Sequence, residues 1–349
     1  MPLRPPKLIL RAARNRASPA HSRRGTQMPA LRLLVLGGTG FVGSHLLPRL
    51  AADGHAITVL SRNRDLHREL TVLPQVRVLS ANVYDRAALA RHLSKADAAL
   101  NLVGILNETH HQRFRRAHVE LTHTLVDACR QMGVPRLVQM SALKAGQGES
   151  KYLRTRGEAE AEVKRSGLAW TLLQSAVIFG PGDGLVSRFA GLLRLLPVLP
   201  LARPRAKMAP VYVGDVVEAI ARCVADPRET GGRTFELYGP DVLTLLEIVR
   251  LIRDAMGVRR AVLPLPDALG WLQAAVAGLL PGKPFSLDNF RSLLTDSVGS
   301  VDGLAALGIV PQRFAPMLPA LLHGRGRQAR IEAARARCAA SCAAGAKDL

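Results

Sequence analysis

Aromatic residues are scarce in this chain of 349 residues, of which Phe, Trp and Tyr make up 4%. Proteins that hold single-stranded nucleic acid stack its bases on aromatic side chains. The formal net charge of +21 would suit a nucleic acid, but no recognition motif accompanies that charge. We therefore expect no nucleic-acid partner. The apolar content of 48% instead indicates a chain that folds around a large core.

Cysteine is also sparse, with four residues at Cys129, Cys223, Cys338 and Cys342. The first two lie in apolar helical patterns that are typical of small buried side chains. The last two lie in an Ala-rich stretch, with no His or further Cys at metal-ligand spacing. We predict neither a disulfide scaffold nor a metal site, and a reducing compartment is the default for such a chain.

Long hydrophobic runs are missing as well. The best candidate is "ALGWLQAAVAGLLPG", Ala268 to Gly282, which is too short to cross a bilayer and contains a proline near its end. We therefore expect no transmembrane span. The segment is compatible with a helix that faces a membrane surface or a partner protein.

Acidic residues are absent from residues 1–27, which carry seven Arg or Lys. An Arg-rich, acid-free start is typical of an organelle transit peptide. The alternative is an upstream start codon, because the apolar pattern begins directly after Met28. The expected location is cytoplasmic, with peripheral contact to the inner membrane as one option, or the mitochondrial matrix if residues 1–27 are a transit peptide.

Strand-like apolar runs alternate with helical patterns from Met28 to about Gly180. Continuous apolar runs are typical of strands buried on both faces, and repeated β-α-β order predicts an α/β, doubly wound parallel sheet, the Rossmann fold. We divide the chain into a basic extension (1–27), a nucleotide-binding Rossmann domain (28–180), a mixed segment that completes the sheet and forms a smaller, mostly helical cap (181–323), and a flexible tail (324–349).

The segment "VLGGTGFVGSHLL" predicts a dinucleotide site. Its glycines, Gly37, Gly40 and Gly43, follow an apolar strand and open a helix, which is the context in which such a motif binds a pyrophosphate. We expect the first glycine to permit a tight turn, the second to let the backbone approach the pyrophosphate, and the third to allow close packing of the helix. Between them, Thr39, Phe41 and Val42 are predicted to contact the cofactor.

The end of the second predicted strand indicates which cofactor is bound. NAD is usually held there by an acidic residue, whereas this chain has Ser61 and Arg62. A guanidinium suits a 2′-phosphate, so NADP(H) is favoured over NAD(H). Asn82 and Val83, after the third strand, are predicted to meet the adenine. The run Leu102, Val103 and Gly104, after the fourth strand, is predicted to lie near the middle of the cofactor.

Taken together, these motifs resemble the extended or atypical short-chain dehydrogenases/reductases, which include NAD-dependent epimerase/dehydratase-like proteins. The residues that carry the resemblance include "GGTGFVGSHL", "RLVQMSAL", "YLRTRGEAE", "SAVIFGPGD", "LLRLLPVLPL" and "PVYVGDVVEAI", and the likeness runs from about Leu31 to Leu322. Within that branch the chain is similar to the group related to the NADPH-binding accessory subunit of respiratory complex I (NADH:ubiquinone oxidoreductase). The resemblance implies a respiratory-complex or membrane-surface partner, and a role in structure rather than turnover.

Three departures from the superfamily pattern bear on catalysis. The family's Tyr-x-x-x-Lys pair is Tyr152 and Arg156 here, an acidic residue near the adenine is replaced by Asn82, and an Arg-Pro pair is replaced by Gln174-Ser175. By resemblance, Tyr152 and Arg156 are the catalytic candidates and also contact the cofactor. Ser141 and Val177 are placed at the same end of it.

Two functions therefore stay open. The chain either binds NADP(H) with little or no turnover, or it is an oxidoreductase or epimerase of a small carbonyl or quinone-related compound, with Tyr152 as the acid/base. Ser141 is the nearest candidate for the hydroxyl of such a site, with contact to the cofactor backbone as its alternative role, and Ser150 is a further candidate. Three residues receive plainer interpretations: His118 as part of a solvated helix start, Asp183 as a turn residue, and Asp215 as a helix N-cap.

Overall fold

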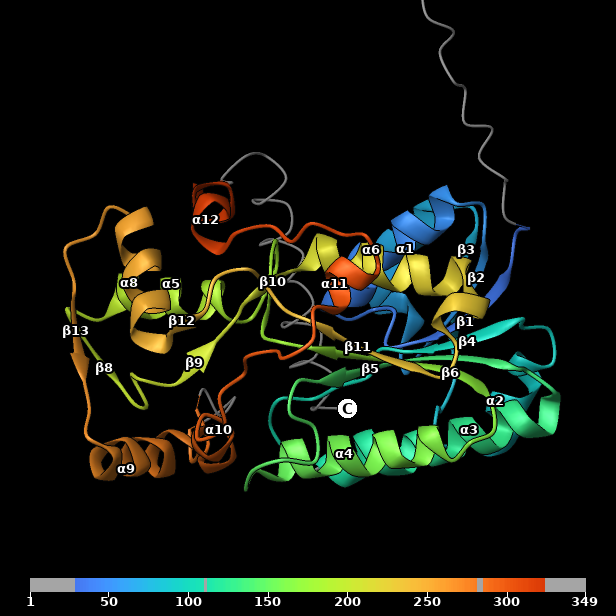
Figure 1. Ribbon diagram of the computed structural model, residues 1–349, viewed down its shortest axis with the longest axis horizontal. Helices are drawn as coiled ribbons and strands as arrows, with labels where there is room; N and C mark the ends of the chain where they lie inside the picture. The colour runs from blue at the N-terminus through green and yellow to red at the C-terminus, as the bar shows by residue number, and fades with distance from the viewer. Residues whose placement is uncertain (1–28, 110–111, 281–284, 324–349) are drawn as a thin grey trace, which may run out of the picture.

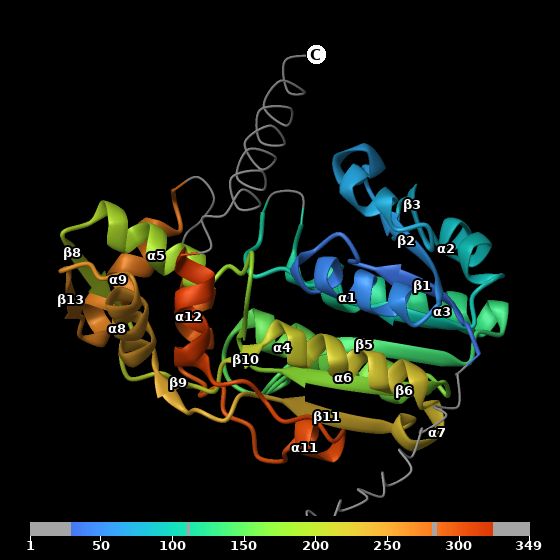
Figure 2. The same ribbon diagram turned by 90° about the horizontal axis from the view of Figure 1, so that it is seen from above.

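The computed structural model describes residues 29–109, 112–280 and 285–323, so the predictions for residues 1–27 and 324–349 lie outside the described part. A seven-stranded sheet with every strand pair parallel forms one half of the molecule, in the order β11-β6-β5-β4-β1-β2-β3 (Figures 1 and 2). Its strands are β1 (Arg32–Leu36), β2 (Ala56–Ser61), β3 (Val76–Ser80), β4 (Ala98–Asn101), β5 (Arg136–Ala142), β6 (Ala169–Ser175) and β11 (Arg233–Leu237). The predicted doubly wound sheet is confirmed.

Helices cover both faces of this sheet because side chains alternate across each strand. In β1, Leu33 and Val35 join the apolar cluster under one helical layer, and Leu34 and Leu36 join the cluster under the other. The first layer contains α1 (Phe41–Ala52) and α6 (Val213–Ala225), and the second contains α2 (Arg86–Leu93), α3 (Leu121–Met132) and α4 (Lys151–Lys164) (Figure 1). Short elements complete this half: η1 (Arg64–Val72), η2 (Arg116–Glu120), α7 (Pro227–Thr230) and α11 (Gly303–Ala306).

The cap lies beyond the carboxyl ends of the central strands and has an apolar cluster of its own (Figure 1). Its helices are α5 (Val186–Leu195), α8 (Leu245–Ala255), α9 (Asp267–Ala277), α10 (Leu287–Ser292) and α12 (Phe314–His323). Three strand pairs accompany them: β7 (Ile178–Phe179) with β10 (Val211–Tyr212), β9 (Lys207–Met208) with β12 (Leu243–Thr244), and β8 (Val198–Leu201) with β13 (Ala261–Pro264). The proline-containing stretch after α5 therefore forms the strand β8.

Helix ends follow the expected chemistry with one exception. Thr244 and Glu247 form a capping box at α8, and Gly133 ends α3 in the left-handed conformation. Asp215, expected to be an N-cap, lies inside the first turn of α6, where its carboxylate accepts from the backbone N–H of Gln312 at 2.7 Å. The side chain thus fastens a distant segment to α6 rather than capping the helix.

No helix within the described ranges is both long enough and apolar enough to cross a membrane. The segment that the sequence marked as too short contains α9, which has 11 residues.

Candidate functional site

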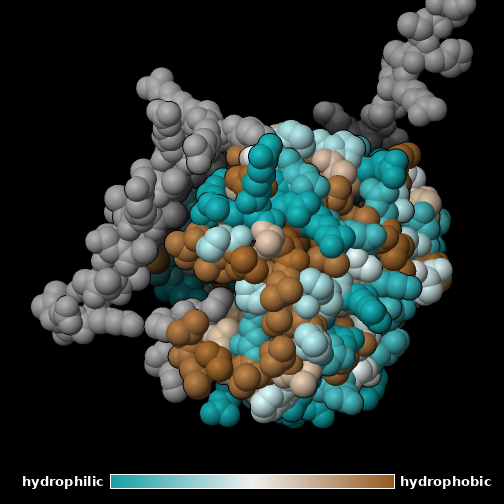
Figure 3. Space-filling model, turned by 90° about the vertical axis from the view of Figure 1, so that its left-hand side faces the viewer, coloured by the Kyte–Doolittle hydropathy of each residue, from teal (hydrophilic) through white to brown (hydrophobic). Residues whose placement is uncertain are grey.

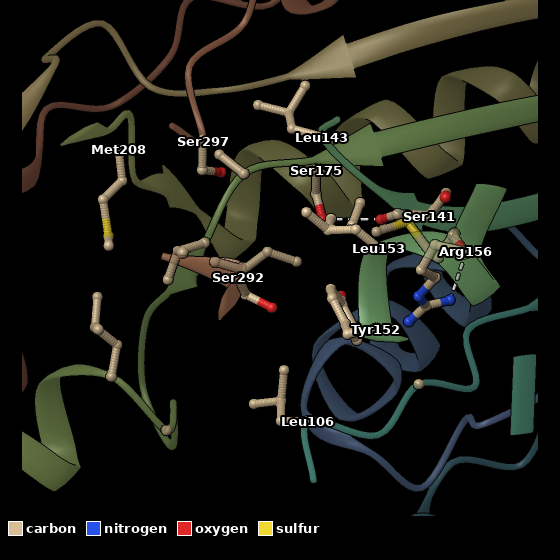
Figure 4. A pocket seen from close by; sticks show the side chains of 18 of the residues that line it. Leu106, Ser141, Leu143, Tyr152, Leu153, Arg156, Ser175, Met208, Ser292 and Ser297 are labelled. Carbon is tan, nitrogen blue, oxygen red and sulfur yellow. Dashed lines mark hydrogen bonds between the residues drawn. The ribbon is translucent and has the colours of Figure 1, made fainter. Parts of the chain in front are cut away.

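A cavity of about 500 Å³ lies between the carboxyl ends of the sheet strands and the cap. Its walls come from the glycine loop after β1, the ends of β5 and β6, helix α4, and the cap segments around Met208 and α10 (Figure 4). Ligands of open parallel sheets bind at this edge, because the connecting loops diverge there and leave a crevice. The cavity is therefore the candidate site.

The glycine loop has the geometry that the sequence predicts. Gly37 has a φ of 75°, and a Cβ placed on it would lie 2.9 Å from the backbone at Leu102 and Val103. A Cβ on Gly43 would fall well inside van der Waals contact with the Gly38 backbone, so α1 packs directly on the loop. At Gly40 such an atom would meet only the loop's own Gly37 carbonyl, at 3.3 Å.

The start of α1 fits a pyrophosphate. Gly40 is the N-cap residue and makes no side-chain capping bond, and the first turn holds no acidic residue. Free N–H groups and the positive end of the helix dipole therefore face the loop. Phe41 and Val42 line the cavity with the glycines, and Thr39, in the turn, does not.

The predicted adenine side lies outside the cavity, on the neighbouring strand ends. Ser61 ends β2 opposite Ser80 of β3, and its hydroxyl bonds within the turn to the carbonyl of Asn63 at 3.2 Å. Arg62 is exposed, and the Gln112 side-chain oxygen, when turned toward the guanidinium, accepts from it at 2.7 Å and 3.2 Å. A guanidinium therefore stands at the end of β2.

Asn82 and Val83 follow β3 in a tight turn. The Asn82 side-chain oxygen accepts from the Tyr84 backbone N–H at 3.1 Å, and Val83 packs against the apolar cluster beneath α2 and α3. Burial raises the pKa of the Tyr84 phenol, and the Arg116 guanidinium stacks on its ring at 4.5 Å. The side chain of Asn82 thus shapes the turn.

Arg156 is the most constrained side chain of the site. It is 7% exposed, and its Nη1 donates to the carbonyl oxygens of Met140 at 3.1 Å and Val103 at 3.3 Å. Its Nε has no hydrogen-bond partner in the described structure, and its Nη2 stands so close over Gly104 that a Cβ there would overlap it. The guanidinium thus joins α4 to the loop after β4 and to the end of β5, and it faces the cavity beside Tyr152 (Figure 4).

Tyr152 lines the cavity one helical turn before Arg156, and the guanidinium carbon of Arg156 lies 5.5 Å from its ring centre. Its ring also meets Phe114 at 5.9 Å and His118 at 5.6 Å, both edge to face. The start of α4 is held from the cap: the Asp288 carboxylate accepts from the backbone N–H of Lys151 at 2.7 Å and from that of Tyr152 at 3.1 Å.

His118 corrects the sequence interpretation of a solvated helix start. It is 1% exposed, because it lies beneath Tyr152 and stacks on Phe114. Burial, with the charge of Arg156, lowers its pKa to about 2. Its Nδ1 lies 2.9 Å from the Thr155 hydroxyl, which donates to the Lys151 carbonyl, so Nδ1 carries the proton of a neutral ring.

The serines of the site separate into different roles. Ser150 is fully buried, and its hydroxyl accepts from the Leu153 N–H, so it is the N-cap of α4 rather than a catalytic hydroxyl. Ser141 is 5% exposed and lines the cavity, and its Oγ has no partner among the described residues. Ser175 also lines the cavity and donates to the Ser141 carbonyl at 3.3 Å.

Two further positions that the sequence marked differ in whether they face the cavity. Val177 lines the cavity beside the cap. Gln174, which replaces the family's Arg, turns away toward α4, where its amide donates to the Glu160 carboxylate at 2.8 Å and 2.9 Å. Gln174 therefore links β6 to α4. Asp183 is a turn residue as predicted, because its carboxylate accepts from the Gly180 N–H at 3.2 Å, and burial raises its pKa.

Sequence reasoning missed the cap side of the cavity. Asn289 and Ser292 of α10 line it, and α10 also holds the opposite wall, because Asn289 donates to the Leu106 carbonyl at 3.1 Å. The cavity is also lined by four basic residues, Lys144, Arg156, Arg188 and Lys207, and by one acid, Asp296. A surplus of cations beside a glycine loop fits a ligand that carries phosphate. No local motif marks these cap positions, since they meet the site only through tertiary folding.

Within the described ranges, no group of three or more His, Cys, Asp or Glu side chains is placed to hold a metal ion.

Comparison with known proteins adds independent support. A family model described as NAD(P)H-binding matches residues 37–184. The subunit 9 protein of the NADH dehydrogenase [ubiquinone] 1 alpha subcomplex is 28% identical in Arabidopsis thaliana, over 80% of this chain and 74% of the relative. Its Mus musculus counterpart is 28% identical over 79% and 76%. A ceramide reductase of Caulobacter vibrioides is 28% identical over 67% and 73%.

Solved structures agree on the fold. A dTDP-glucose 4,6-dehydratase from Streptomyces venezuelae, with NAD bound, superposes with a TM-score of 0.66 at 23% identity, over 84% of this chain and 96% of that one. These findings support an NAD(P)H-binding domain over residues 37–184 and a likeness to the complex I subunit 9 proteins, and the solved structure shares the fold.

Proposed function

We propose that this protein binds NADP(H) in preference to NAD(H) and holds it with little or no turnover, as an accessory subunit would. The observation that carries the proposal is the setting of Arg156. Its guanidinium donates to two main-chain carbonyls and fills the space over Gly104. The reductases of this superfamily use a lysine here, whose compact ammonium can pass on a proton. A guanidinium has a different shape and does not readily lose a proton.

The cofactor preference is supported by the end of β2. Arg62 stands exposed there, and no acidic residue occupies the two positions after Ser61. The nearest following acid, Asp65, pairs with Arg64 at 3.6 Å, and its backbone N–H is bound by the Asn63 side chain. A ribose 2′-phosphate therefore meets a cation at this strand end, whereas a free 2′-OH lacks the carboxylate that usually holds it.

The partner in this proposal is a respiratory complex or the membrane surface beside it. The relatives from Arabidopsis thaliana and Mus musculus are both named as mitochondrial complex I subunits, which supports such a partner. The protein would then lie at the inner membrane, on its cytoplasmic or its matrix side.

A second candidate function is a reductase or epimerase of a carbonyl or quinone-related compound. It is favoured by the cavity, which continues from the glycine loop past Tyr152 to the apolar cap residues Met208 and Leu293. A relative named as a ceramide reductase also supports it. When bound, a reduced nicotinamide supplies a hydride. Tyr152 would give its phenolic proton to the carbonyl oxygen, and Arg156 would place a positive charge beside that ring.

The two candidates are separated by substitutions at the pair. We expect Tyr152→Phe and Arg156→Lys to bind NADPH within about twofold of wild type, since the first keeps the aromatic ring and the second keeps the positive charge. Wild type should leave NADPH unoxidised across a panel of carbonyls and quinones. Tyr84→Phe, outside the cavity, is the matched control. A measurable NADPH-dependent reduction that Tyr152→Phe abolishes and Tyr84→Phe does not would reject the low-turnover proposal in favour of the second candidate.

A further inference from the structure

Helix α9 exposes an unusual amount of apolar surface. It is attached to the cap through its small residues Gly270 and Ala274, and a Cβ on Gly270 would lie 3.0 Å from Ala202 and 3.2 Å from Phe290. The opposite side of the helix and its continuation carry six large apolar side chains that are each at least 51% exposed. We call these the α9 face: Leu269, Trp271, Leu272, Val276, Leu279 and Leu280.

The α9 face continues onto the neighbouring strands of the cap. Gln273 donates to the Pro200 carbonyl in β8 at 2.9 Å, which places α9 against the β8–β13 pair. Val198 of β8 and Leu263 of β13 are 46% and 52% exposed, and Leu195, at the end of α5, is 78% exposed. Apolar residues accordingly gather over the lower and central parts of this end of the molecule, with polar ones above (Figure 3). Soluble monomers rarely leave so much contiguous apolar surface without a use for it.

Basic residues border this surface. Helix α9 contains no Lys or Arg, and its one acid, Asp267, pairs with Arg203 at 2.6 Å. Four exposed arginines lie, along the chain, within a few residues of the apolar surface or of Ala202 and Phe290 beneath α9: Arg194, Arg205, Arg259 and Arg291. No carboxylate of the described residues lies within ion-pair distance of any of them. We call these four residues the arginine rim, and they bring uncompensated positive charge to the segments next to the apolar surface.

We propose that the α9 face docks on an anionic lipid bilayer, with α9 lying in the interface rather than crossing it. A bilayer offers acyl chains to Leu and Val, the polar–apolar boundary that Trp prefers, and acidic head groups to the arginine rim. A second copy of the chain would have to bring its own arginine rim against this one. Like charge at a self-complementary contact is costly, and this favours the lipid surface.

Docking would bring the nucleotide cavity close to the lipid. Phe290, against which α9 packs, belongs to α10, and Asn289, Ser292 and Leu293 of the same segment line the cavity. One helix therefore separates the α9 face from the cavity wall. The inference rests on the membrane-surface partner of the proposed function and names the surface that would meet it, and it does not depend on the state of the nucleotide.

The test is flotation of the full chain with vesicles of phosphatidylcholine alone, and of phosphatidylcholine with about one third phosphatidylglycerol. We expect wild type to float with the anionic vesicles and to be released by salt. Leu279→Ser, at a position 87% exposed, and Trp271→Ser/Leu272→Ser should each weaken binding about tenfold through lost apolar contact. Arg259→Glu should weaken it at least about fivefold. Val72→Ser, at a residue 78% exposed on η1, is the matched control and should float as wild type does.

NADPH titration and light scattering of the same variants complete the test. Unchanged NADPH affinity with lost flotation supports the inference, and flotation without NADPH binding would reject the nucleotide proposal alone. Wild type that does not float, or a Leu279→Ser variant that floats as well as wild type, would overturn the docking surface. A wild-type dimer that Leu279→Ser converts to a monomer, without vesicle binding, would show a self-interface instead. Trp271 emission should shift to shorter wavelength on anionic vesicles, and Trp271→Phe should lose that shift.

Discussion

The glycine loop and the Tyr152–Arg156 pair face the same cavity but are held in different ways. The loop is fixed by backbone against backbone, with Gly37 beside Leu102 and Gly43 against Gly38. The pair depends on side chains from elsewhere, since Asp288 of the cap binds the start of α4. A site fixed by backbone contacts tolerates almost no substitution. A site held by side chains from distant segments can keep its shape and still lose its chemistry. The four predictions below test that difference.

Substitution inside the loop should have the largest effect. Gly43→Ala places a Cβ against the Gly38 backbone, so we expect a loss of about 3 kcal/mol of folding free energy and of measurable NADPH binding. The matched control is Gly191→Ala in α5, where an added Cβ meets nothing within 4 Å and helix propensity should stabilise by about 0.5–1 kcal/mol. Thermal unfolding and NADPH titration measure both. Equal effects of the two substitutions would show that close backbone contacts do not fix the conformation of the loop.

Arg62→Ala tests the cofactor preference at the end of β2. Loss of a charge-assisted contact costs about 1.5–3 kcal/mol, so NADPH affinity should fall about 10- to 100-fold while NADH affinity changes little. Arg64→Ala is the control, because Arg64 pairs with the adjacent Asp65. Calorimetric titration with both nucleotides measures the difference. Equal losses for NADPH and NADH would contradict the 2′-phosphate assignment.

The pH dependence of folding stability tests the part of the site that is held by side chains, through His118. The unfolded chain takes up a proton near pH 6.5, whereas the folded ring, with its pKa lowered to about 2 by burial, stays neutral. Stability should therefore fall as the pH drops below 6.5, by about 2 kcal/mol between pH 7 and pH 5. His118→Gln should remove that share of the pH dependence in urea unfolding. His123→Gln, at a side chain that is 61% exposed, is the matched control variant. A wild-type slope in His118→Gln would mean that other groups cause the acid sensitivity.

Asp288→Ala should have the smallest effect. It tests the link between the cap and the Tyr152–Arg156 pair. It leaves the N–H groups of Lys151 and Tyr152 without their acceptor, at a cost of about 1 kcal/mol, as for a lost helix cap. Asp85→Ala removes the cap of α2, which contacts two N–H groups away from the cavity, and should cost about the same. Hydrogen exchange at residues 151–154 should quicken only in Asp288→Ala. Faster exchange in both variants would indicate a general loss of stability.

The same contrast explains what could be predicted from the sequence. The strands read as continuous apolar runs because both faces of the sheet are covered, and the glycines are informative because each meets a backbone atom only a few residues away or on a neighbouring strand. Local spacing therefore sufficed for the fold and for the loop.

Other assignments needed tertiary contacts. His118 resembles a polar residue of a helix start, and only the packing of Phe114 and Tyr152 over it shows that it is buried. Asp215 has the sequence position of a cap but binds the Gln312 N–H, 97 residues away. The strand β8 contains Pro200, and its partner β13 lies some 60 residues later. No local pattern carries this information.

The most direct test of the central claim is the state of the nucleotide in the purified protein. We predict that NADP(H) co-purifies in preference to NAD(H), and that the bound reduced form keeps its absorbance near 340 nm when aldehydes, ketones or quinones are added. Retention of the reduced nucleotide by wild type and by Tyr152→Phe alike would support a holding role set by Arg156. Rapid loss of that absorbance in wild type, absent in Tyr152→Phe, would contradict the claim.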